Sequence, residues 1–237
     1  MREHERKCFI LPPLSGGMAS SPIYISEQHR YSLDSFTVPV HYRDSLESIM
    51  IPKGMVKDRI QKMAKEIHQD YEGKHPTIVC ILKGADKFFG DLTHVLDGIN
   101  SGKDAQSVPF QTDFLRASSY RNDASTGQVK LLMADMESLR GKDILLVEDI
   151  IDTGETITRT IDEMNRYGPA SIKVASVLVK RTLRSNGYVP NYAGFSIPDL
   201  FVVGYCMDYN EHFRDLSHIC IINKQGVEKY KLRENKP

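Results

Sequence analysis

Short apolar runs alternate with amphipathic segments along most of this chain. Four of the runs are TIVCIL (77–82), DILLV (143–147), IKVASVLV (172–179) and FVVGYCM (201–207). Buried strands separated by helices are typical of a parallel sheet with crossover helices packed on its faces. We therefore predict an α/β fold built on a twisted parallel sheet that is flanked by helices.

The apolar residues between these runs have the spacing of helices. In residues 53–71 they recur at intervals of four, three and four, which places Val56, Ile60, Met63 and Ile67 on one face. A second helix-like stretch, after the first run, carries Phe88, Phe89, Leu92, Val95 and Leu96 on one face, and residues 156–167 have the pattern of a third helix. Residues 110–133 hold two strand-like ends around a polar centre.

The length of 237 residues favours one substantial domain with additions. Residues 1–30 contain three Pro, two adjacent Gly and several Ser without apolar periodicity. We predict that they form an N-terminal extension that is partly loose, and that residues 31–237 form the main domain.

The composition argues against several classes of partner. Lys plus Arg equals Asp plus Glu at 31 each, so a general electrostatic footprint for nucleic acid is absent and no nucleic-acid partner is expected. No apolar run approaches 18 residues, so we expect no membrane partner, and the run at residues 8–11 is too short for a signal peptide. The four cysteines show no metal or disulfide spacing, which favours reduced thiols and a cytoplasmic location.

Charged residues follow each of the four apolar runs. They are Lys83 beside Gly84, Glu148 with Asp149, Lys180 with Arg181, and Asp208. Ligands of open α/β sheets bind beyond the carboxyl ends of the strands, so these groups favour an anionic substrate bound with the help of a metal. A strand that leaves the core must turn polar anyway, and for any single strand this remains the alternative.

The segment ILLVEDIIDTGETITRTI (144–161) carries the densest functional signal. A buried strand leads to Glu148 and Asp149 and then to the turn 152–156, which opens a helix. Backbone N–H groups and the helix dipole at such a turn bind anions, and glycine permits close approach. Hydroxyl donors from Thr153 and Thr156 add to this cradle. The pattern indicates a sugar phosphate whose vicinal hydroxyls are held by the two carboxylates.

Other nucleotide-binding motifs are missing from the sequence. It contains neither a Walker A loop nor G-x-G-x-x-G, so nucleoside triphosphates and dinucleotides are poorly supported. An ordinary helix N-cap at Asp152 remains an alternative, although it leaves Glu148 and Asp149 unexplained.

Within this segment, VEDIIDTGET (147–156) resembles the phosphoribosyl pyrophosphate motif of type I phosphoribosyltransferases. Residues 31–237 resemble the hypoxanthine–guanine members of that family, through ILKGADKFF, FLRASSYRNDASTG, ASVLVKRT, FVVGYCMDYNEHFRDL and HICIIN, in the family's order. The resemblance implies transfer of the phosphoribosyl group from 5-phosphoribosyl 1-pyrophosphate to hypoxanthine or guanine, giving IMP or GMP and pyrophosphate in purine salvage. It also implies dependence on Mg²⁺ and assembly as a homodimer or homotetramer.

The resemblance assigns roles to residues on the sugar-phosphate side. Asp152 would be the general base, and the turn with Thr153, Gly154, Glu155 and Thr156 would bind the 5′-phosphate. Glu148 and Asp149 would bind the ribose hydroxyls, and with Asp208 they are the expected metal ligands. The pyrophosphate would contact Arg214, Gly84 and the peptide between Leu82 and Lys83, a bond that is often cis in the family.

For the purine, the resemblance points to Lys180, Phe201 and Val202. Lys180 is a donor-only group, so it can bind a 6-oxo group but offers nothing to a 6-amino group. The ring of Phe201 would stack on the base and the Val202 backbone would accept from its edge, although Phe201 alone has the pattern of a core residue. We expect a hood from residues 31–50 and 190–237 to carry both.

A lid is expected because the reacting sugar carbon must be kept from water. Residues 116–128, with Ser119 and Tyr120 as the closing residues, are the candidate, and a plain hairpin loop is the alternative. Ala85, Ser118 and Leu200 depart from the residues common in the family. They leave open a paralogue of low turnover that binds purine nucleotides or acts as a regulator.

Overall fold

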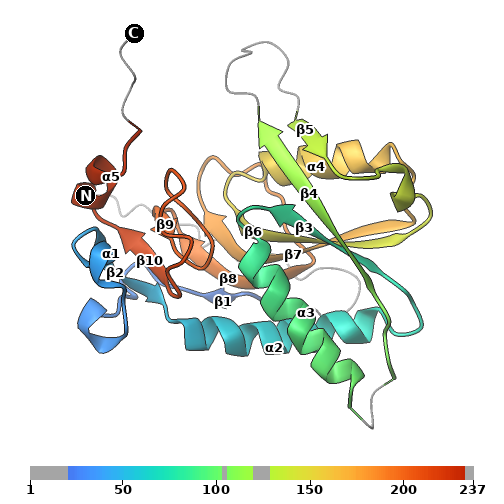
Figure 1. The fold of residues 1–237 in the computed structure, drawn as a ribbon, viewed down its shortest axis with the longest axis horizontal. Helices are drawn as coiled ribbons and strands as arrows, with labels where there is room; N and C mark the ends of the chain where they lie inside the picture. The colour runs from blue at the N-terminus through green and yellow to red at the C-terminus, as the bar shows by residue number, and fades with distance from the viewer. Residues whose placement is uncertain (1–20, 103–105, 120–128, 233–237) are drawn as a thin grey trace, which may run out of the picture.

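The computed structural model describes residues 21–102, 106–119 and 129–232. Its main element is a seven-stranded sheet in the order β1-β8-β7-β6-β3-β4-β5 (Figure 1). Six of these strands run parallel, and β5 pairs antiparallel with β4 at one edge. The strands are β1 (Ile23–Tyr24), β3 (Thr77–Leu82), β4 (Gln111–Ser119), β5 (Val129–Leu132), β6 (Asp143–Ile151), β7 (Ser171–Arg181) and β8 (Tyr192–Pro198).

Helices cover both faces of this sheet. In Figure 1, α2 (Lys53–Asp70) lies along the lower side and α4 (Glu155–Asn165) along the upper side, and α3 (Asp86–Asn100) packs with α2. Alternation along β3 explains the two layers, because Ile78 and Cys80 pack with α2 and α3 whereas Val79 and Ile81 pack with α4. Both faces of the central strands are therefore buried, as their continuous apolar sequence requires.

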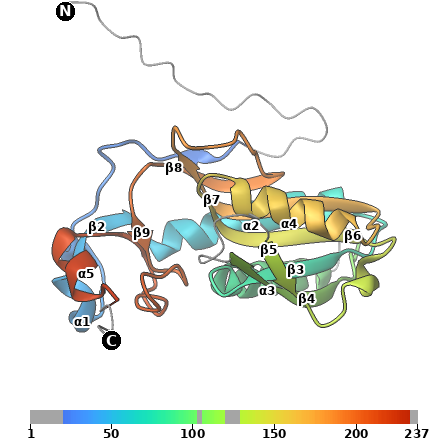
Figure 2. The same cartoon turned by 90° about the horizontal axis from the view of Figure 1, so that it is seen from above.

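A smaller antiparallel sheet forms the hood, which lies at one end of the molecule (Figure 2). Its strands, in the order β2-β10-β9, are β2 (Leu46–Ile51), β10 (Ile219–Ile222) and β9 (Val202–Val203). The short helices α1 (Val40–Arg43) and α5 (Lys224–Lys229) and the 3-10 turn η1 (Leu33–Ser35) complete it, and a second turn, η2 (Glu137–Leu139), precedes β6. Segments from both ends of the chain thus build the hood, as predicted.

The predicted fold class is confirmed, with differences in individual strands. The first apolar run is β3 with the predicted bounds, but β6 and β7 continue past their apolar runs to Ile151 and Arg181. The expectation that 201–207 is a strand ending in Asp208 is wrong, because only Val202–Val203 is extended and it belongs to the hood. The strand beside β7 is instead β8, which the sequence analysis missed.

The N-terminal part of the described chain packs on the main sheet. β1 pairs in parallel with β8, and Ile25 is buried. The Arg181 side chain donates to the carbonyls of Ile25 and Ser196 at 2.7 and 2.6 Å, so this cation ties the N-terminal segment to the sheet instead of facing the predicted site. The division of the chain at residue 30 stays a prediction.

Two further observations concern the thiols and the helices of the described residues. Cys80, Cys206 and Cys220 are free thiols. Within the described ranges, each helix is too short or too polar to cross a lipid bilayer.

Candidate active site

The turn between β6 and α4 has the geometry of an anion cradle. Gly154 is the N-cap of α4 with φ +83°, and no side chain caps the helix there, so Asp152 is not an ordinary N-cap. A Cβ on Gly154 would lie 2.1 Å from Asn186 Oδ1, which explains why glycine is needed at this position. Asn186 also donates its backbone N–H to the Thr153 carbonyl at 2.8 Å and thereby holds the turn.

Asp152 and Lys180 form an ion pair at the end of β6. The Lys180 Nζ atom lies 3.1 Å from Asp152 Oδ2, and the Lys180 side chain is only 9% exposed. Arg184 approaches the other carboxylate oxygen at 3.6 Å. The structure thus brings together the two groups assigned to proton removal and to reading the base.

Glu148 and Asp149 lie within β6, before the turn. Glu148 is buried and accepts from the Asp149 backbone N–H at 3.1 Å, whereas Asp149 Oδ1 accepts from the Ile150 N–H at 2.7 Å. Burial, with the adjacent carboxylate of Asp149, raises the pKa of Glu148 well above its usual value. The two side chains therefore differ. Glu148 is buried and is protonated more readily than an ordinary glutamate, whereas Asp149 is more exposed to solvent.

The Lys83–Gly84 turn lies against Asp149. The Leu82–Lys83 peptide bond is cis, and a Cβ on Gly84 would lie 1.9 Å from Asp149 Oδ2. A side chain at position 84 would therefore displace the Asp149 carboxylate, which comes from β6. The next residue, Ala85, is fully buried in the core.

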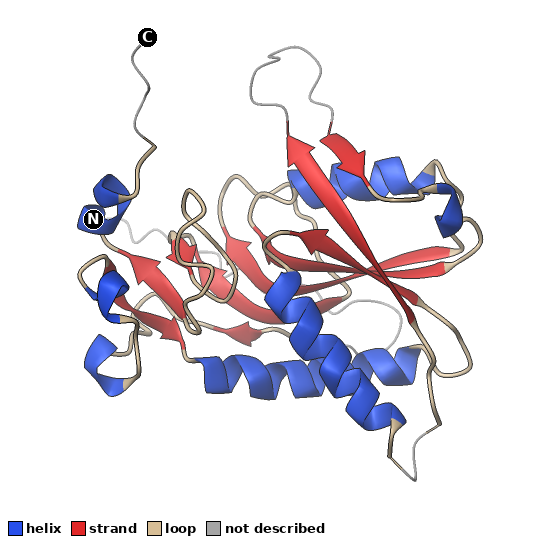
Figure 3. Ribbon diagram, viewed as in Figure 1, coloured by secondary structure: helices blue, strands red, loops and turns tan. Residues whose placement is uncertain are grey.

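The hood contributes a long irregular loop, residues 204–216, drawn without helix or strand in Figure 3. Arg214 pairs with Asp208 at 2.8 Å and donates to the Cys206 carbonyl at 2.8 Å. Glu211 bridges Arg214 and Lys83, so the loop joins the β3 turn. Ion pairing with Arg214 and Lys83 lowers the pKa of Glu211. Sequence reasoning missed Glu211; its spacing of three residues from Arg214 was the one available signal.

Phe201 lies at the hood and is not a core residue. Its side chain is 49% exposed, and its ring meets that of Tyr209 edge-on at 5.5 Å. Val202 is buried in β9 and pairs with Ile221, so its backbone is fixed by the hood sheet. The adjacent Leu200 packs against the main core.

Some predicted site residues cannot be placed. Tyr120 and most of the candidate lid, residues 120–128, lie outside the described residues, and Ser119 is described only as the last residue of β4. The lid stays a prediction.

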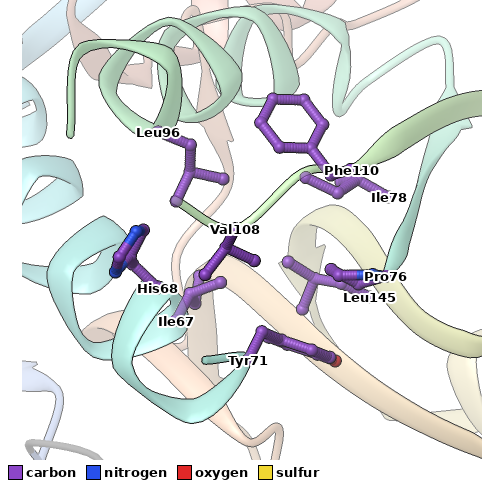
Figure 4. Close-up of a pocket in the computed structure, with 9 residues that line it drawn as sticks. All are labelled: Ile67, His68, Tyr71, Pro76, Ile78, Leu96, Val108, Phe110 and Leu145. Atoms are coloured by element: carbon purple, nitrogen blue, oxygen red, sulfur yellow. The ribbon is translucent and has the colours of Figure 1, made fainter. Parts of the chain in front are cut away.

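An apolar pocket lies elsewhere, between the C-terminal parts of α2 and α3 and the segments that enter β3 and β4 (Figure 4). It contains none of the predicted site residues. Its lining residues are Ile67, His68, Tyr71, Pro76, Ile78, Leu96, Val108, Phe110 and Leu145.

The fold and the cradle define a phosphoribosyltransferase, and the phosphoribosyl transferase domain family matches residues 52–210. The rat (Rattus norvegicus) hypoxanthine-guanine phosphoribosyltransferase is 46% identical over 215 residues, covering 90% of this chain and 98% of its own. The human (Homo sapiens) hypoxanthine-guanine phosphoribosyltransferase is 48% identical over 202 residues, 85% of this chain and 92% of its own. The chain belongs to the hypoxanthine-guanine phosphoribosyltransferase family.

A solved structure supports this membership. The crystal structure of the Schistosoma mansoni hypoxanthine-guanine phosphoribosyltransferase in complex with IMP has a TM-score of 0.75 at 36% identity. The match covers 89% of this chain and all of that one.

Proposed function

We propose that the chain transfers the phosphoribosyl group of 5-phosphoribosyl 1-pyrophosphate to hypoxanthine or guanine in purine salvage, giving IMP or GMP and pyrophosphate. The observation that carries the proposal is the Lys180–Asp152 ion pair directly beside the anion cradle of α4. Lys180, which would bind the 6-oxo group of the purine, and Asp152, which would act as the general base, lie there next to the phosphate site. The relative that binds IMP agrees with this reading.

The cradle would bind the 5′-phosphate and orient the ribose. Backbone N–H groups from Thr153 to Thr156 at the start of α4 favour a phosphate through the helix dipole. Glu148 and Asp149 would accept hydrogen bonds from the ribose hydroxyls, next to the sugar carbon on which positive charge develops.

The purine would lie between Lys180 and Phe201. Lys180 donates to the 6-oxo group, the exposed ring of Phe201 stacks on the base, and the Val202 backbone accepts from the base edge. As N9 of the purine forms its bond to C1′ and the bond to pyrophosphate breaks, Asp152 accepts the purine proton. An Asp152→Asn variant should bind GMP but lose roughly 10²–10⁴-fold in turnover; full activity would exclude this role.

Lys83, Gly84 and Arg214 would contact the pyrophosphate. Both cations stabilise the negative charge that the leaving group gains. The described residues contain no cluster of three or more metal-binding side chains. Mg²⁺ typically takes one or two carboxylates together with substrate phosphates, and Asp208 in the hood loop, or Glu148 and Asp149 on β6, would supply that number. The ion, when bound, would neutralise charge on the leaving group.

Turnover with four bases tests the proposal. Assays contain Mg²⁺, 5-phosphoribosyl 1-pyrophosphate and hypoxanthine, guanine, xanthine or adenine, and product formation is followed by ultraviolet absorbance. We expect product from hypoxanthine and guanine and none from adenine. Tight GMP binding without product from any base would instead favour the low-turnover paralogue.

We also propose a cytoplasmic location and a homodimer or homotetramer. Size-exclusion chromatography with light scattering at micromolar concentration tests the assembly, and a monomer would contradict it.

A further inference from the structure

The carboxylate of Glu211 lies between the two cations that the proposed function assigns to pyrophosphate. Its Oε2 atom is 3.0 Å from Lys83 Nζ and 3.3 Å from Arg214 Nε. Its Oε1 atom is 3.3 Å from the terminal NH2 group of Arg214. One carboxylate therefore bridges a cation that follows β3 and a cation in the hood loop.

The backbone around Glu211 is specialised to hold it there. Asn210 and Glu211 have φ of +52° and +68°, and the flanking Tyr209 and His212 exchange two backbone hydrogen bonds. Two positive φ values between paired residues are the pattern of a type I′ turn, which favours Asn and then Gly. Glu211 thus occupies a position where glycine would be less strained, and its N–H donates to Asp208 Oδ2 at 2.7 Å.

This arrangement removes the local excess of positive charge. Lys83 and Arg214 carry two positive charges, and Asp208 and Glu211 balance them with two negative ones. A site for a polyanion gains from a surplus of cations, and Glu211 would leave such a surplus here when it moves aside. The Glu211 side chain is 63% exposed, so it has room to move into solvent.

We propose that Glu211 is an internal competitor of pyrophosphate, holding Lys83 and Arg214 with its carboxylate and giving them up when the phosphates bind. This inference rests on the proposed function, from which it takes the roles of Lys83 and Arg214. Glu211 is therefore a residue that sets affinity, because it weakens the binding of the pyrophosphate group in both the substrate and the product.

Calorimetric titration of the full chain with inorganic pyrophosphate, at a fixed excess of Mg²⁺, tests this. Glu211→Gln keeps the side-chain size and removes the charge, and we expect it to lower the Kd for pyrophosphate roughly three- to tenfold, the scale of two exposed ion pairs. Glu211→Gly suits the positive φ and should give the same gain. The Kd for ribose 5-phosphate, which would bind at the α4 cradle, should not change.

Glu137→Gln is the matched control. Glu137 is an exposed glutamate paired with an arginine three residues away, as Glu211 is, but it lies in η2, before β6. This variant should bind pyrophosphate like the wild type. A Lys83→Met change added to Glu211→Gln should remove much of the gain, because one of the two cations that the Glu211 substitution frees for pyrophosphate is gone.

The possible outcomes distinguish a failure of the Glu211 role from a failure of the proposed function. If the wild type binds pyrophosphate and both Glu211 variants bind it equally well or more weakly, the competitor role alone is overturned. An equal gain for ribose 5-phosphate would also overturn it, since the effect would then be general electrostatics. Failure of wild type and variants alike to bind pyrophosphate would overturn the placement of pyrophosphate at Lys83 and Arg214, and the inference with it.

Discussion

Lys180 is the residue whose two contacts bear most directly on specificity. In the structure it pairs with Asp152, and in the proposed reaction it also donates to the 6-oxo group of the base. Its ammonium is nearly buried, and a buried donor left without an acceptor costs about 1–3 kcal/mol. A base with a 6-amino group would impose that cost, which is the physical reason to expect that adenine is rejected.

Replacing Lys180 with Met should lower kcat/KM for guanine and hypoxanthine roughly 10- to 100-fold, the loss expected for a charge-assisted hydrogen bond of about 1.5–3 kcal/mol. The low rate with adenine should change far less, so discrimination should shrink. Initial rates with each base measure both effects.

Lys173→Met provides the control, because Lys173 also lies on β7 and pairs with an aspartate, Asp70, at 2.9 Å. It belongs to no proposed site and should leave kcat/KM unchanged. Equal losses in the two variants would show that the Lys180 effect is structural.

Among the elements, the turn into α4 depends on Gly154. A Gly154→Ala change meets two costs, the positive φ and the clash with Asn186. We expect a loss of more than the ~1–2 kcal/mol of a left-handed residue, together with weaker binding of ribose 5-phosphate. Thermal melting and calorimetry measure these quantities.

Gly73→Ala isolates the first cost, because Gly73 has φ +72° and a Cβ added there would meet no atom within 4 Å. The stability difference between the two variants reports the crowding at the cradle. Equal losses of stability and unchanged ribose 5-phosphate binding would argue against a tightly fitted turn.

The start of α2 depends on a histidine from the hood. His218 Nδ1 accepts from the Lys53 backbone N–H at 3.0 Å, and the opposite nitrogen lies 3.2 Å from the Thr37 carbonyl. A neutral ring protonated on Nε2 satisfies both contacts, whereas a charged ring loses the first. Burial accordingly lowers the pKa of His218 below its usual 6.5.

This sets the sign of a pH effect. Because the folded pKa is the lower one, the contribution of His218 to stability is complete above about pH 6.5 and is lost as the pH falls from there toward the folded pKa. The urea midpoint of the wild type should therefore fall more steeply between pH 7 and 5 than that of His218→Gln. Parallel pH profiles would contradict this.

Elements with strong local patterns were predictable from the sequence. The continuous apolar run predicts β3, and the helical spacing of apolar residues predicts α2. The cradle is predicted by a buried strand followed by a turn in which Gly154 lies between Thr153 and Thr156. β8 was missed because its sequence, YAGFSIP, contains Gly, Ser and Pro. Gly194 is there because a Cβ would lie 2.5 Å from the Val177 carbonyl, a contact between strands that no local pattern shows.

Glu211 was missed for a related reason. It meets Lys83 across 128 residues of sequence, through a turn whose positive φ values do not follow from Asn-Glu. Likewise, nothing in the sequence around Arg181, the last residue of β7, indicates that its side chain binds the Ile25 carbonyl of the N-terminal segment. The features that could not be predicted, β8 and the contacts of Glu211 and Arg181, depend on residues that are distant in the sequence and not on a single local motif.

For the whole molecule, the N-terminal segment is part of the main sheet. A chain beginning at Tyr31 lacks β1, buried Ile25 and the carbonyl that Arg181 binds. Loss of one buried Ile costs about 1.5–3 kcal/mol, which corresponds to roughly 3–12 °C in Tm for a chain of this size. Calorimetry should show that chain melting below one that begins at Ser21; equal Tm values would place the boundary at residue 30.

The proposed site is divided unevenly along the chain. One continuous stretch, β6 with the turn after it, carries the carboxylates and the cradle assigned to the sugar phosphate. The groups assigned to the purine come from β7 and the hood, which are separate in sequence and in sheet. Descendants of such a chain can therefore exchange one base for another by altering the purine-facing positions of β7 and the hood, while inheriting the binding of the ribose 5-phosphate unchanged.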